Sequence, residues 1–167
     1  HQTGRLPDEL IAQGLAYPYR AWNSKPGTTA LPLNYAPLEQ ALGSSPSLAP
    51  VIAQELSPGS GFCELRPTDI DQALSGLQSA HALVRMHAAW IMSERSLGAD
   101  AGKRILPALA QALRQDPDED VRYQVMQALL DWKKASAKYL SDIEHAAQHD
   151  ASEDVRELAQ EWLDEYR

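Results

Sequence analysis

Two histidines on one predicted helix are the side chains that come closest to forming a metal site. His145 and His149 stand four residues apart, which places both imidazoles on one helix face at a spacing that can bind zinc. The stretch HAAQH lacks the glutamate that a metalloprotease helix carries beside its first histidine. Histidines exposed on a helix surface are the commoner outcome of this pattern, and we therefore predict no metal.

No other group of residues is arranged for catalysis. Cys63, the single cysteine, lies in the stretch GFCEL without a basic neighbour that would activate its thiol. Gly59 and Gly61 do not lead into the Lys-Ser/Thr pair of a phosphate-binding loop. The sequence therefore predicts a protein that is not an enzyme and that uses no cofactor.

The balance of charge limits the partners. The chain carries 15 Lys and Arg against 23 Asp and Glu, a formal net charge of −8. Nucleic-acid binders hold phosphates with clustered basic side chains, so this balance argues against nucleic acid. No apolar run is long enough to span a bilayer, which argues against membrane insertion. Most of the excess acid lies in residues 67–167, which indicates either a solvated face or a surface for a basic partner.

One stretch occurs three times and supplies the helices that would position a binding surface. Residues 116–132, DPDEDVRYQVMQALLDW, begin with a predicted N-cap at Asp116, a proline and three acidic residues, which are helix-start signals. The stretch returns as DASEDVRELAQEWLDEY at 150–166 and, more weakly, as SAHALVRMHAAWIMSER at 79–95. Its Val-Arg pair recurs at spacings of 37 and 34 residues, a period typical of helical-repeat solenoids.

The pattern of Asp-Pro, Val-Arg and small or apolar residues at 125, 128 and 129 resembles the second helix of a HEAT repeat. Among such repeats it is most similar to the HEAT-like repeats of phycobilin lyases. The resemblance implies an all-α fold, a short right-handed α-solenoid of three HEAT-like helix pairs that binds proteins. The expected units cover about residues 67–98, 102–134 and 137–167.

Residues 1–66 differ from the repeats in composition and show no period. They contain eight of the eleven prolines and six of the nine glycines. Residues 6–17 fit a short amphipathic helix, and residues 36–42 and 48–56 fit single helical turns or short helices. We expect this irregular, Pro/Gly-rich region to cap the first helix pair, because the end of a solenoid otherwise exposes apolar surface.

The arginines of the repeated Val-Arg pairs are expected to be structural. The HEAT-like resemblance implies that each arginine points toward the neighbouring unit and pairs with an acidic residue at the turn. Such a bidentate pair would fix the angle between units. The acid directly before the Val-Arg pair is the expected partner. The residues assigned to this inter-repeat role are Arg85, Arg122, Arg156, Asp120 and Asp154.

The resemblance also implies that the second helices line the concave side of the stack, which is the predicted binding face. Positions two, six and nine residues after each valine share one helix flank by the 3.6-residue period. This row grades from apolar and aromatic to acidic, and its Met, Trp and Tyr are typical interface residues. Packing under the N-terminal region is an equal alternative for its first two members. The predicted partner-binding residues are Met86, Trp90, Tyr123, Gln127, Leu130, Glu157, Glu161 and Asp164.

These features predict a non-catalytic protein-binding module that is monomeric when free. Its most specific version is an inhibitor or immunity-type protein that neutralises a bacterial toxin or enzyme, and a scaffold subunit is the alternative. The phycobilin-lyase resemblance implies a third function, an accessory lyase or chaperone-lyase, with Trp90, Tyr123 and Glu161 around a pigment. The start at His1 fits a removed signal peptide, a trimmed domain or a tag scar, and favours the bacterial periplasm over the cytoplasm.

Overall fold

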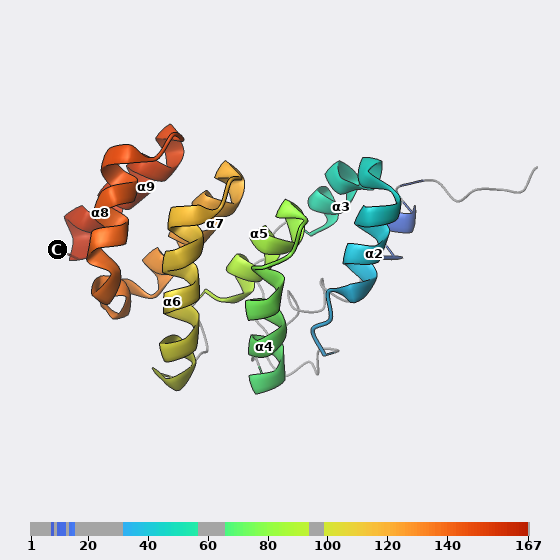
Figure 1. Ribbon diagram of the computed structural model, residues 1–167, viewed down its shortest axis with the longest axis horizontal. Coiled ribbons are helices and arrows are strands. Elements are labelled where there is room, and N and C mark those ends of the chain that lie inside the picture. The colour runs from blue at the N-terminus through green and yellow to red at the C-terminus, as the bar shows by residue number, and fades with distance from the viewer. Residues whose placement is uncertain are drawn as a thin grey trace, which may run out of the picture. The chain divides into compact units, whose positions relative to one another are not determined.

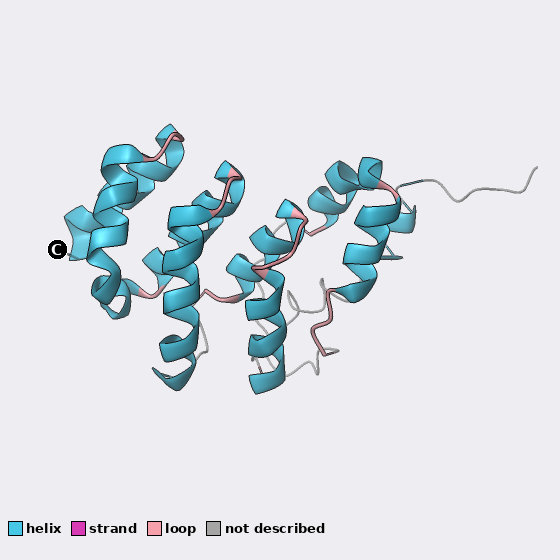
Figure 2. Cartoon of the chain, in the orientation of Figure 1, coloured by secondary structure: helices cyan, strands magenta, loops and turns pink. Residues whose placement is uncertain are grey.

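A computed structural model describes residues 8, 10–12, 14–15, 32–56, 66–93 and 99–166. Helices account for most of these residues, and no strand occurs among them (Figure 2). The chain divides into two compact regions, an N-terminal region, His1–Glu64, and a C-terminal region, Leu65–Arg167. The expected capping of the first helix pair by residues 1–66 concerns the placement of one region on the other, and it stays a prediction.

The N-terminal region contains short helices with a proline at or next to their first residue. They are α2 (Ala36–Ser44), the 3-10 helix η2 (Pro46–Leu48) and α3 (Ala49–Glu55). Each has a proline in its first two positions, where a missing N–H costs no helical hydrogen bond. Of the helix expected at residues 6–17, the described positions are helical and the others lie outside the described residues.

The C-terminal region is a stack of helix pairs (Figure 1). Its elements are α4 (Pro67–Gly76), α5 (Ala82–Ile91), α6 (Ala99–Gln115), α7 (Glu119–Asp131), the 3-10 helix η3 (Lys133–Tyr139), α8 (Leu140–His149) and α9 (Glu153–Tyr166). The pairs are α4/α5, α6/α7 and α8/α9, and successive pairs pack side by side. The first helices α4, α6 and α8 form one layer and the second helices α5, α7 and α9 form the other. This confirms the predicted all-α solenoid.

The start of α7 shows how the repeated stretch forms a helix. Its N-cap is Asp118, whose Oδ1 accepts hydrogen bonds from the backbone N–H groups of Asp120 and Val121. The predicted N-cap, Asp116, is wrong by two residues, because the chain completes a turn through Pro117 before the helix begins. In that turn the Asp116 carboxylate accepts a hydrogen bond of 3.0 Å from the Asp118 N–H.

The seam between the second helices is apolar and closed. The valine of each Val-Arg pair is fully buried, at Val84, Val121 and Val155. A fully buried side chain at these positions contributes on the order of 1.5–3 kcal/mol of hydrophobic stabilisation. The period seen in the sequence is therefore the period at which neighbouring units bury their shared core.

Two tryptophan N–H groups tie successive units together. Trp132 Nε1 donates to the Met92 carbonyl at 2.8 Å, which joins the end of α7 to the end of α5. Trp162 Nε1 in α9 donates to Ser136 Oγ in η3 at 2.9 Å. Gly102 lets α6 approach the first of these rings, since a Cβ there would lie 2.9 Å from a Trp132 ring carbon. These bonds satisfy the only polar atom of each buried indole.

Candidate functional site

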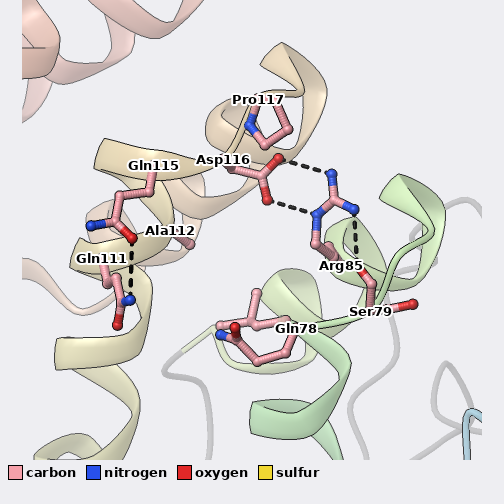
Figure 3. A pocket seen from close by; sticks show the side chains of 9 residues that line it. Gln78, Ser79, Arg85, Gln111, Ala112, Gln115, Asp116 and Pro117 are labelled. Atoms are coloured by element: carbon pink, nitrogen blue, oxygen red, sulfur yellow. Dashed lines mark hydrogen bonds and ion pairs between the residues drawn. The ribbon is translucent and has the colours of Figure 1, made fainter.

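An arginine fork joins the first helix pair to the second (Figure 3). Arg85 Nε donates to Asp116 Oδ2 at 2.7 Å, and Arg85 Nη2 donates to Asp116 Oδ1 at 3.0 Å. Arg85 Nη1 donates to the Ser79 carbonyl, also at 3.0 Å. The side chains of Arg85 and Asp116 are only 12% and 5% exposed, so the pair is shielded from water. Bidentate geometry of this kind fixes the relative orientation of the two elements that it joins.

The same fork recurs between the second and third pairs. Arg122 Nε and Nη2 donate to the two carboxylate oxygens of Asp150, each at 2.8 Å, and Nη1 donates to the Asp116 carbonyl. The hydrogen bond that Arg122 donates to Asp150 raises the pKa of Arg122 above its usual value. Burial raises the pKa of Asp150, but hydrogen bonds from Arg122 and the Ser152 N–H, with the charges of Arg122 and Arg156, lower it below its usual value.

The acid partners of these arginines differ from the predicted ones. Asp120 and Asp154 lie in the first turns of α7 and α9 and are exposed, and among the described residues no arginine bonds their carboxylates. Asp116 and Asp150, four residues earlier, precede the helix and face the second helix of the preceding unit. The inter-unit pairing was therefore predicted correctly for Arg85 and Arg122, but with the wrong acids.

Arg156 has the same anchor but a different partner. Its Nη1 donates to the carbonyls of Asp150 at 2.7 Å and Ala151 at 3.1 Å. Within the described residues, no carboxylate lies on its fork. The predicted inter-unit pair at this arginine is thus not found in the described part of the chain.

The centre of the predicted binding row lies on α7 and is accessible. Tyr123 is 39% exposed, and its hydroxyl accepts a hydrogen bond of 3.3 Å from Gln127 Nε2 one turn later. Among the described residues of the C-terminal region, Tyr123 is the one large apolar side chain that is exposed. A ring held by a neighbour on its own helix loses little side-chain entropy when a partner covers it.

The remaining predicted binding residues are also at least partly accessible. Met86 and Trp90 on α5 and Leu130 on α7 are half-buried. Glu157, Glu161 and Asp164 on α9 are exposed. Since α5 packs on α7 and α7 packs on α9, all eight residues belong to one helix layer. Their use by a partner, and the concavity of the face, stay predictions.

Acidic side chains line a shallow open depression on α9. The residues around it are Glu157, Gln160, Glu161, Asp164 and Glu165. Gln160 Nε2 donates to Asp164 Oδ1 at 2.7 Å, and the two glutamates of the predicted row, Glu157 and Glu161, are exposed. Clustered carboxylates of this kind attract basic surfaces and repel acidic ones.

Sequence reasoning missed an open pocket of about 280 Å³ beside the first arginine fork (Figure 3). Gln111 and Gln115 of α6 and Gln78 after α4 line it together with the Arg85–Asp116 pair. Gln111 Nε2 donates to Gln115 Oε1 at 3.2 Å. The pocket lies where the turns of two units meet, and only the recurrence of polar residues at the ends of the first helices could have indicated it.

The histidines and the glycine-cysteine segment have these outcomes. His145 and His149 are exposed on α8 with their ring centroids 5.0 Å apart. Among the described residues, no three His, Cys, Asp or Glu side chains gather closely enough to hold a metal. Gly59, Gly61 and Cys63 lie outside the described residues. No helix in the described part of the chain has the length and apolar content needed to cross a membrane.

A family model described as HEAT repeats matches residues 70–164, more than half of the chain. The match spans all three helix pairs from α4 into α9. It supports the HEAT-repeat resemblance but adds nothing to the phycobilin-lyase detail. The comparisons with curated proteins and with solved structures gave no match.

Proposed function

The chain belongs to the HEAT-repeat family, whose stacked helix pairs generally bind other proteins, and we propose that its partner docks on the second-helix layer around Tyr123. The observation that carries this proposal is the exposed Tyr123 ring, because the other large apolar side chains described in the C-terminal region lie in the core or are half-buried. Aromatic side chains of this kind contribute disproportionately to binding energy at interfaces.

The chemistry of the partner follows from what flanks Tyr123. The half-buried Met86 and Trp90 lie on α5, and the exposed carboxylates of Glu157 and Glu161 lie on α9. A complementary partner would present an apolar pocket for the tyrosine and basic side chains for the acidic end. Such an arrangement gives specificity and a fast, salt-dependent association rate.

As the finer function we propose an inhibitor or immunity-type protein that neutralises a bacterial toxin or enzyme. An acidic binding face supports this version, because it suits a partner whose own surface is basic. Recovery of one toxic partner would favour this version, whereas several housekeeping partners would favour a scaffold subunit. A chromophore that copurifies with the chain would instead favour the accessory-lyase function.

The test is the affinity of the purified partner for the double variant Tyr123→Ala/Gln127→Ala. We expect a loss of at least tenfold in affinity, since an aromatic hot spot is worth roughly 2 kcal/mol or more. The matched control is Gln111→Ala/Gln115→Ala, which removes an equivalent pair of hydrogen-bonded side chains from the other layer. Loss of binding in the control alone would move the docking site to the pocket beside Arg85 and remove it from Tyr123.

A further inference from the structure

Three arginines in this chain share one anchor. In each, Nη1 donates to the carbonyl oxygen of the residue six positions earlier, at 2.7–3.0 Å. The pairs are Arg85 with Ser79, Arg122 with Asp116, and Arg156 with Asp150. This common bond holds each guanidinium against the turn before its own helix.

The rest of the fork distinguishes the last arginine from the other two. Nε and Nη2 of Arg85 and Arg122 hold both oxygens of an aspartate from the next unit. On Arg156, no acceptor for Nε or Nη2 is found among the described residues. We propose that this fork, in the first turn of α9, is a second docking point that receives a carboxylate from a partner protein.

The surface around Arg156 suits a polar contact better than a buried helix seam. Four residues after the inner arginines stand Ala89 and Met126, which are fully buried in the stack. The corresponding residue on α9 is Gln160, which is exposed and hydrogen-bonded to Asp164. The occupant is therefore a separately folded partner that continues the inter-unit ion pairing without adding to the apolar core.

The charges near Arg156 restrict this partner further. Glu157 and Glu161 on the same helix are exposed, so an isolated acidic segment would be repelled. The partner carboxylate must therefore come with basic neighbours that meet these glutamates. The expected occupant is a turn at the start of a helix, with one Asp or Glu flanked by Lys or Arg.

A second copy of this chain is not the expected occupant. The turn position that holds Asp116 and Asp150 in the second and third units holds Ser79 in the first. Ser79 Oγ accepts the N–H of the residue two positions later, as both aspartates do, so the three positions are equivalent. A head-to-tail copy would thus offer Arg156 a neutral hydroxyl in place of the two charged oxygens that match a guanidinium fork.

The test follows the arginine Nε–Hε resonances of the isotope-labelled chain during titration with a defined peptide. The probe is residues 145–155 carrying Glu153→Lys and Asp154→Lys, which keeps the Asp150 turn and removes its flanking acid. We expect a saturable shift at Arg156, while the occupied forks of Arg85 and Arg122 stay unchanged and serve as internal controls. The variant Arg156→Lys assigns the resonance by its disappearance.

Two comparisons decide the proposal. The same peptide with Asp150→Asn should bind about fivefold more weakly, as measured by the Arg156 resonance. The Asp150 probe should also bind the variant Arg156→Lys about fivefold more weakly, as measured by the backbone amide resonances around position 156, because lysine keeps the charge but loses the fork. An Arg156 resonance that does not move, or that moves equally with both peptides, would overturn the proposal. Association of the chain with itself through Arg156 would overturn the choice of partner. This site goes beyond the proposed Tyr123 face, and since Tyr123 and Gln127 lie on α7, either surface can fail alone.

Discussion

Arg122 and Tyr123 are neighbours in the chain, yet they belong to opposite kinds of surface. Arg122 is 12% exposed and bonded to two turns, whereas Tyr123 is 39% exposed and, among the described residues, is bonded to Gln127 on its own helix. One step along a helix rotates the side chain by about 100°, which is enough to pass from the closed seam to the open face. The position of Arg122 holds arginine in all three helix pairs, while the next position along the helix holds Met86, Tyr123 and Glu157. The two inner arginines, Arg85 and Arg122, thus hold neighbouring helix pairs together, and the varied face position is where we propose recognition.

The largest effect on stability should come from breaking the ion pair between Asp150 and Arg122. The change Asp150→Ala leaves the Arg122 fork without its carboxylate in a site shielded from water, and should lower the free energy of unfolding by about 2–3 kcal/mol. Denaturant unfolding measures this loss. The matched control is Asp142→Ala, whose ion pair with Arg114 is more exposed, at 22% and 42%, and which should cost under about 1 kcal/mol. Equal losses for the two variants would contradict the distinction between closed and open ion pairs.

The second-helix layer also contains a buried titratable group, His87 on α5. Burial lowers the pKa of His87 to about 3, so the folded chain binds fewer protons than the unfolded chain between that value and about 6.5. Stability contributed by the neutral ring is therefore fully present above pH 6.5 and is lost as the pH falls. The slope should approach about 1.4 kcal/mol per pH unit near pH 5.

The variant His87→Gln isolates this contribution. It should flatten the dependence of the unfolding free energy on pH between 6.5 and 4.5, because glutamine does not titrate. Urea unfolding at four pH values is sufficient to measure both slopes. Parallel curves for the variant and the unsubstituted chain would show that the pKa of His87 is not lowered in the folded chain.

The smallest effect on stability should come from the open face. The double variant Tyr123→Ala/Gln127→Ala removes accessible groups and a hydrogen bond within one helix, so the free energy of unfolding should change by under about 0.5 kcal/mol. Thermal unfolding provides the check. A loss as large as that of Asp150→Ala would place Tyr123 in the packing of the solenoid and remove it from recognition.

The sequence predicted the helix pairs well, because the apolar period and the Val-Arg spacing are the same features that build the seam. It could not choose the acid for each arginine. Asp116 and Asp120 both have counterparts in the third unit, Asp150 and Asp154, so spacing alone leaves two equivalent partners. The choice depends on the turn before α7, which starts the helix two residues later than expected and aims Asp116 back at Arg85.

The binding row was predicted on different grounds, which explains what was missed. Helical period is sufficient to place Tyr123 and Gln127 on one flank, and their hydrogen bond confirms that they lie together. The pocket beside Arg85 has no such local signature, since Gln78 comes from one unit and Gln111 from the next. Sites formed between units require the stacking geometry, which a single repeat does not contain.

Photo-cross-linking from position 123 tests the central claim most directly. A benzophenone side chain replaces Tyr123 in one variant and Gln111 in the other, and both are irradiated with the purified partner. Tyr123 lies in the second-helix layer and Gln111 in the first, and both are exposed. We predict that the partner is captured from position 123 and not from position 111. Capture from position 111 with none from position 123 would contradict the assignment of the binding face.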